Sequence, residues 1–172
     1  MPILIFLATV VGGALFWAYR ARGAADATRG AVEMGRDALG AARQWNFKRR
    51  TNVHPVDCVD EPAVARGALA TALVELGDLP TREDRDALLV ALQSRLDLSL
   101  GEAEEFAALG HWLVGQCGGP AAAVPRLARR LARIDGPEAA SAMADLAETA
   151  LRGAPGDAQA DALSEMARRL GR

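Results

Sequence analysis

The sequence predicts an all-α protein with a single N-terminal transmembrane helix, an amphipathic basic neck helix and a bundle of about six helices. Residues 2–19 contain no charged side chain, and apolar residues further on recur at helical spacing between Gly/Pro turns. The chain is 51% hydrophobic but only 5% aromatic, so its apolar content consists largely of small side chains that suit close helix packing. Its 172 residues suffice for one ordinary domain and an appendage.

Residues 1–20 are expected to form an uncleaved membrane anchor, because the uncharged stretch 2–19 would rise about 27 Å as a helix. Trp17 and Tyr19 mark its membrane interface, and Arg20 and Arg22 follow at once. These charges belong on the inside, which predicts an N-terminus outside and a body in the cytoplasm. A cleaved signal peptide and a buried helix are the alternatives. The residues expected to pack against another transmembrane helix are Ala8, Gly12 and Gly13.

Residues 21–50 are predicted to form the basic neck helix. From residue 20 to 50 there are eight Lys/Arg against three Asp/Glu, whereas the rest of the chain has 12 basic and 19 acidic residues. Arginines recur every seven residues from Arg22 to Arg50, and the opposite face is small and apolar, which favours a close partner helix over the alternative of a solvated stalk. The predicted partner-binding residues are Arg29, Val32, Arg36, Leu39 and Arg43.

The end of the neck combines two aromatic and three cationic residues, a mixture that can rest on an anionic leaflet. Ordinary packing is the alternative interpretation, and stacking on single-stranded nucleic acid is a remote one. A net charge of -2 argues against a general nucleic-acid binder. Residues 51–61 are expected to be a linker. The predicted interface residues here are Trp45, Phe47, Lys48, Arg49 and Arg50.

Residues 62–172 are predicted to form the helical domain, and no strand is expected. Thr81 and Asp157 are expected N-caps, and Ser99 with Glu102 has the pattern of a capping box. Four arginines make a basic face that we expect to be solvated or paired with the acidic body. The expected helices cover about 62–77, 82–96, 100–116, 120–133, 138–151 and 158–170, and the arginines are Arg126, Arg129, Arg130 and Arg133.

The hairpin over residues 68–96, the following Leu98-Ser99-Leu100-Gly101-Glu102-Ala103 and a second hairpin resemble the TerB-like helical family. That family includes the tellurite-resistance protein TerB and the N-terminal domain of the membrane-anchored co-chaperone DjlA. The resemblance covers residues 60–172, roughly two thirds of the chain, and implies a helical domain of that fold.

The family usually carries an Ala-Asp-Gly turn and a later Glu in each of two repeats, an acidic cluster proposed to hold metal ions. The first turn here reads Leu76-Gly77-Asp78-Leu79-Pro80, with Glu83 at the later position. The second turn, over residues 151–155, lacks the Asp, and Gln159 stands near the expected Glu. The resemblance therefore leaves only Asp78 and Glu83 as weak candidate metal ligands.

Two histidines and two cysteines make a zinc site arithmetically possible, but His111 and Cys117 are six residues apart and point to different sides of a helix. His54 and Cys58 belong to the expected linker, and both cysteines are expected to be free thiols in a reducing cytoplasm. The sequence contains no phosphate-binding Gly loop, zinc-protease or Cys-x-x-Cys motif, so we expect no catalytic residue and no cofactor.

These patterns favour a membrane-anchored, non-enzymatic interaction protein, an accessory subunit or assembly factor of a larger membrane protein complex. The expected partners are membrane lipid and other integral membrane subunits or a second copy, with no nucleic acid and no small-molecule substrate. The expected location is the bacterial inner (cytoplasmic) membrane. A protein of tellurite or metal stress, with a weak divalent-cation site, is the alternative.

Overall fold

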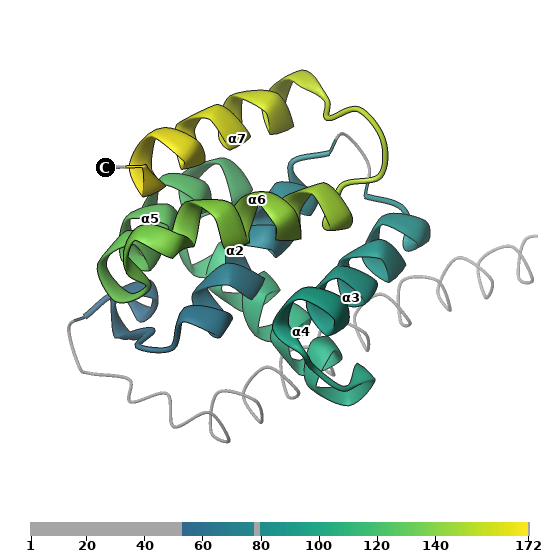
Figure 1. Ribbon diagram of the computed structural model, residues 1–172, viewed down its shortest axis with the longest axis horizontal. Helices are drawn as coiled ribbons and strands as arrows, with labels where there is room; N and C mark the ends of the chain where they lie inside the picture. The colour runs from purple at the N-terminus through teal and green to yellow at the C-terminus, as the bar shows by residue number, and fades with distance from the viewer. Residues whose placement is uncertain (1–52, 78–79, 172) are drawn as a thin grey trace, which may run out of the picture. The chain divides into compact units, whose positions relative to one another are not determined.

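The computed structural model describes residues 53–77 and 80–171, and throughout these ranges the regular structure is helical (Figure 1). Six α-helices and two short 3₁₀ helices are present there without a strand, which confirms the all-α class for the body. The elements are η1 (Pro55–Cys58), α2 (Pro62–Glu75), α3 (Arg82–Leu96), α4 (Leu100–Gln116), α5 (Pro120–Ile134), η2 (Gly136–Glu138), α6 (Ala139–Ala150) and α7 (Asp157–Leu170).

The predicted anchor and neck lie outside the described residues. Among the residues that are described, no helix combines the length and the hydropathy that crossing a membrane requires. The predicted site residues outside the description are Ala8, Gly12, Gly13, Trp17, Tyr19, Arg20, Arg22, Arg29, Val32, Arg36, Leu39, Arg43, Trp45, Phe47, Lys48, Arg49, Arg50 and Asp78.

Helix α2 is the centre of the bundle, and α4 and α5 pack along it (Figure 1). Ten of its 14 residues are buried, so it shows no polar face. A helix that is apolar all round is stable only when other elements enclose it. The other helices supply this enclosure, since α3, α6 and α7 also contact α2.

Close approach of α2 and α4 depends on glycine. A methyl group added at Gly110 of α4 would lie 2.5 Å from Thr71 Oγ1 and 3.2 Å from the Ala68 Cα atom of α2. Thr71 is buried, and its hydroxyl donates to the carbonyl of Gly67 at 2.9 Å, which satisfies its polar group inside the core. The two backbones therefore approach at a distance that a larger residue at position 110 would prevent.

Side-chain caps fix the starts of α3 and α4. Thr81 and Asp84 exchange hydrogen bonds, as do Ser99 and Glu102, so the predicted cap at Thr81 and the predicted capping box at Ser99 are both confirmed. The bonds from Thr81 hold the pKa of Asp84 below its ordinary value. At α7 the expected cap was wrong by one residue: Gly156 takes the extended N-cap conformation and Asp157 begins the helix.

The segment expected to be a linker is in part a packed element. Val56 and Val59 are 0% and 2% exposed and belong to the hydrophobic core. His54 holds this segment in place, since its Nδ1 accepts from the amide of Val56 at 3.3 Å and its Nε2 lies 3.1 Å from the carbonyl of Gln116. One neutral tautomer, with its hydrogen on Nε2, satisfies both contacts.

We predict that Gly110→Ala lowers the free energy of unfolding by about 1–2 kcal/mol, because overpacking against Thr71 outweighs the helix propensity that alanine gains. Gly115→Ala in the same helix is the matched control. A methyl group there meets no atom within 4 Å, so the variant gains about 0.5–1 kcal/mol. Urea unfolding of the full-length protein in mild detergent measures both values, and equal stabilisation by both substitutions would contradict the close packing.

Candidate functional site

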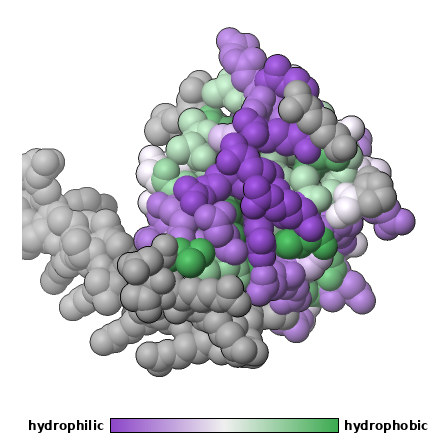
Figure 2. Space-filling model, turned by 90° about the vertical axis from the view of Figure 1, so that its left-hand side faces the viewer, coloured by the Kyte–Doolittle hydropathy of each residue, from purple (hydrophilic) through white to green (hydrophobic). Residues whose placement is uncertain are grey.

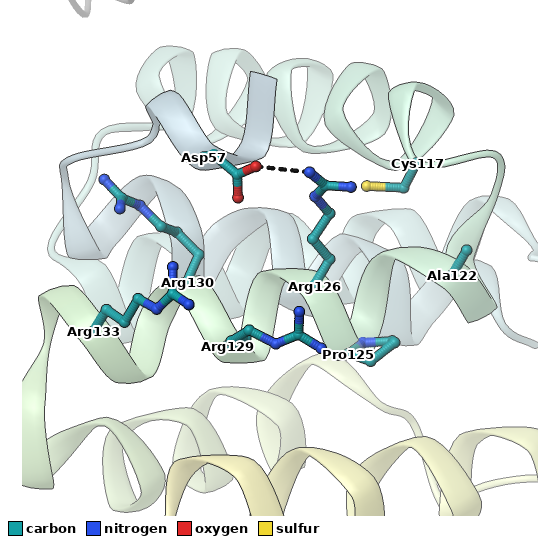
Figure 3. A pocket seen from close by; sticks show the side chains of 8 residues that line it. All are labelled: Asp57, Cys117, Ala122, Pro125, Arg126, Arg129, Arg130 and Arg133. Atoms are coloured by element: carbon teal, nitrogen blue, oxygen red, sulfur yellow. Dashed lines mark hydrogen bonds and ion pairs between the residues drawn. The ribbon is translucent and has the colours of Figure 1, made fainter. Parts of the chain in front are cut away.

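Four arginines of α5 surround a hollow of about 520 Å³ beside η1 (Figure 3). Figure 3 shows Arg126 directed towards Asp57 and Cys117, while Arg129 and Arg133 lie along the α5 ribbon and do not extend towards Asp57. We call this feature the arginine hollow. Its lining residues are Asp57, Cys117, Ala122, Pro125, Arg126, Arg129, Arg130 and Arg133.

The amphipathic pattern of α5 explains why the arginines share one side. They occupy positions i, i+3, i+4 and i+7 of the helix, which place side chains on one face. The apolar residues of the same helix, among them Val124, Leu127 and Leu131, are buried in the core. Burial of this apolar face therefore sets the direction in which the arginines point.

Two of the arginines hold η1 and the two residues that follow it against α5. Arg126 Nη2 lies 2.7 Å from Asp57 Oδ2, and Arg130 Nη2 lies 2.5 Å from Asp60 Oδ1. The Nε of Arg130 also donates to the carbonyl of Val59 at 2.6 Å. These bonds join residues about 70 positions apart and fasten the beginning of the described chain to the bundle.

The other two arginines are directed outward. Arg129 and Arg133 are exposed, and the side chain of neither makes a hydrogen bond or ion pair with another residue of the described ranges. The sequence left open whether this face is solvated or paired with acidic residues; within 53–77 and 80–171 two of its arginines are paired and two are solvated. Partial burial raises the pKa of the Cys117 thiol, which is therefore protonated at neutral pH.

The turn before α3 and the turn before α7, which were compared with the acidic turns of the TerB-like family, lie close together. Glu83, at the start of α3, lies with its Oε2 2.5 Å from Arg152 Nη1 in the turn before α7. A hollow of about 160 Å³ lies between the turns, lined by Gly77, Pro80 and Asp84 on one side and by residues of 150–155 on the other. A cation, the Arg152 guanidinium, is thus already bound to the one described candidate ligand.

The other polar groups at this turn pair are also engaged. Gln159 donates to the carbonyl of Leu73 at 3.1 Å and accepts from the amide of Gly156 at 3.1 Å, so it ties α7 to the end of α2. The carboxylate of Asp84 caps α3 through Thr81. A hard divalent cation prefers several free oxygen ligands, and the described residues of this turn pair do not favour such a site.

The two histidines make contacts in different parts of the bundle. His111 Nδ1 lies 2.6 Å from Glu75 Oε1, whereas His54 binds the end of α4. Cys58 and Cys117 are both free thiols. In the part of the chain that the structure describes, no three His, Cys, Asp or Glu side chains group closely enough to hold a metal ion.

Comparison of the chain with protein-family models, with curated proteins and with solved structures finds no match. The resemblance to the TerB-like family therefore stays a prediction. Sequence reasoning located the basic face of α5 but missed the hollow, because its other wall comes from the segment expected to be a linker. The signal that could have indicated it was the pair of acids Asp57 and Asp60 in that segment.

We predict that the His111–Glu75 pair makes stability depend on pH. The hydrogen bond to Glu75 raises the pKa of His111, and partial burial and Arg85 oppose this only in part. The stabilisation is therefore complete below the unfolded pKa of about 6.5 and is lost as pH rises through the higher folded pKa. Thermal midpoints of the full-length protein and of Glu75→Gln should differ most at about pH 6 and converge as the pH rises through the raised folded pKa of His111. A difference that stays constant over this range would contradict the assignment.

Millimolar calcium should leave the thermal midpoint of the full-length protein unchanged, because Arg152 already neutralises Glu83 and Asp84 caps its helix. Differential scanning fluorimetry with calcium, and with magnesium in parallel, measures this. A rise in the midpoint that disappears in Glu83→Gln would overturn the expectation and favour a cation site at the turn pair.

Proposed function

We propose that this chain is a membrane-anchored, non-enzymatic interaction protein, an accessory subunit or assembly factor of a larger membrane protein complex. The observation that carries the proposal is the arginine hollow, where Arg129 and Arg133 are exposed and make no bond to the other described residues. A rigid helix supports these cations, because α5 packs on both α2 and α7. Charged groups held in this way favour selective association with a complementary surface.

The proposed mechanism is confinement at the membrane. The uncharged residues 2–19 would anchor the chain, and Ala8, Gly12 and Gly13 would let a partner helix approach. The arginine stripe of the neck would contact lipid headgroups or a subunit of the complex. A weak contact of the body then gains effective concentration, because both partners are held at the same membrane.

The proposed location is the bacterial inner membrane, with the N-terminus outside and the body in the cytoplasm. The basic residues that follow the uncharged segment support this orientation. The alternative function in metal stress has no supporting observation among the described residues, since Glu83 is paired with Arg152. The proposed partners are lipid and other integral membrane subunits or a second copy of the chain.

The proposal is tested by purifying the full-length protein from its native membranes in mild detergent and identifying the proteins that accompany it. We expect integral membrane proteins at a fixed ratio, and we expect them to be lost from a shortened chain that begins at Asn52. The neck variant Arg29→Gln/Arg36→Gln/Arg43→Gln should recover fewer of them, because it removes three of the predicted contacts. Recovery of the full-length protein alone, at the mass of a single copy, would contradict the proposal.

A further inference from the structure

We propose that the arginine hollow binds an acidic peptide segment of a partner protein, with the guanidinium groups of Arg129 and Arg133 as its anchors. This inference rests on the proposed function and names the chemistry of its partner. Figure 2 shows the side of the bundle on which η1 and α5 lie, where a continuous band of hydrophilic side chains crosses the surface. The volume of the hollow, about 520 Å³, can receive several side chains.

The protein already binds one of its own segments in this way. Residues 55–60 lie against α5, and their carboxylates, Asp57 and Asp60, pair with Arg126 and Arg130. The same segment offers the carbonyl of Val59 to the Nε of Arg130. Side-chain carboxylates and a backbone carbonyl of a short segment are therefore the groups that the inner two arginines recognise, and Arg129 and Arg133 continue the same face.

The spacing of the outer two arginines fits an extended acidic segment. Arg129 and Arg133 are four residues apart on α5, which separates them by about 6 Å along the helix axis. In an extended chain, side chains two residues apart lie on one side at about 6.6 Å. Two acidic residues in the pattern Glu-x-Glu can therefore meet the two guanidinium groups, each of which can form a bidentate pair with a carboxylate.

Charge favours a peptide over an anionic membrane surface. From residue 51 onward the chain has 12 basic and 19 acidic residues, so an extended anionic bilayer repels the body as a whole. A short segment contacts only the local cations, within a Debye length of about 10 Å. The concave shape of the site also fits a segment better than it fits a plane.

The test uses the full-length protein in phosphatidylcholine nanodiscs and a fluorescein-labelled peptide of repeated Glu-Ser units, with a Gln-Ser peptide as its neutral twin. Anisotropy should show binding of the Glu-Ser peptide at least about tenfold tighter than of the twin, and weaker at higher salt. Arg129→Gln/Arg133→Gln should weaken binding about tenfold. The matched control is Arg82→Gln/Arg85→Gln on α3, which removes the same charge from exposed positions and should change binding less than about twofold.

Equal binding of the Glu-Ser peptide by both double variants would overturn the inference. Sedimentation of the nanodiscs with phosphatidylglycerol vesicles, lost in Arg129→Gln/Arg133→Gln and without any binding of the peptide, would assign the hollow to a lipid surface instead. The result is separable from that of the proposed function. If native partners still accompany the Arg129→Gln/Arg133→Gln variant and the unsubstituted protein does not bind the Glu-Ser peptide, the proposed function stands through its anchor and neck and this inference falls.

Discussion

The burial of α2 is the constraint on which the rest of the bundle depends. Its small residues, Gly67, Ala68 and Thr71, let α4 approach through Gly110, and its apolar surface requires cover on every side. Helix α5 provides part of this cover and is fastened at its end, where Arg66 of α2 makes two hydrogen bonds, at 2.6 and 2.7 Å, to the carboxylate of Asp135. This pair is largely buried, with side-chain exposures of 21% and 10%, so it is less screened by water than the surface pairs. Because the apolar face of α5 packs on α2, the arginine face of α5 must lie at the surface of the bundle.

The arginines of α5 connect the fold with the proposed function. Arg126 and Arg130 use carboxylates of the chain itself to hold η1, and that segment completes one wall of the hollow. Arg129 and Arg133 repeat the same chemistry towards the outside. At the opposite pair of turns the balance differs, because Arg152 there is paired with Glu83. At the turns where the TerB-like resemblance implies an acidic cluster, the charge of Glu83 is thus neutralised by Arg152 of the same chain. The α5 face, in contrast, keeps an excess of positive charge.

Local pattern predicted most of the helical fold. Apolar periodicity and the capping residues placed α3 and α4, since Thr81 and Ser99 act through contacts with residues three positions away. The core position of η1 was missed, because Val56 and Val59 lie in a short segment with a proline and no helical period. The pairs of Arg126 with Asp57 and of Glu83 with Arg152 join residues 69 positions apart, which no local pattern encodes. At α7 the residue-type preference for N-caps predicted Asp157. The N-cap is instead Gly156, whose amide donates a hydrogen bond to the side chain of Gln159. The anchor and neck remain predictions from charge and hydropathy alone.

Hydrogen exchange of the full-length protein in nanodiscs, with and without the Glu-Ser peptide, tests the central claim that the α5 face is the binding surface of the body. We expect slower exchange of backbone amides in η1 and α5 when the peptide is present, and unchanged exchange around Gly77 and Leu151 at the turn pair. Slower exchange at the turn pair, with η1 and α5 unaffected, would instead place the binding site at the opposite end of the bundle.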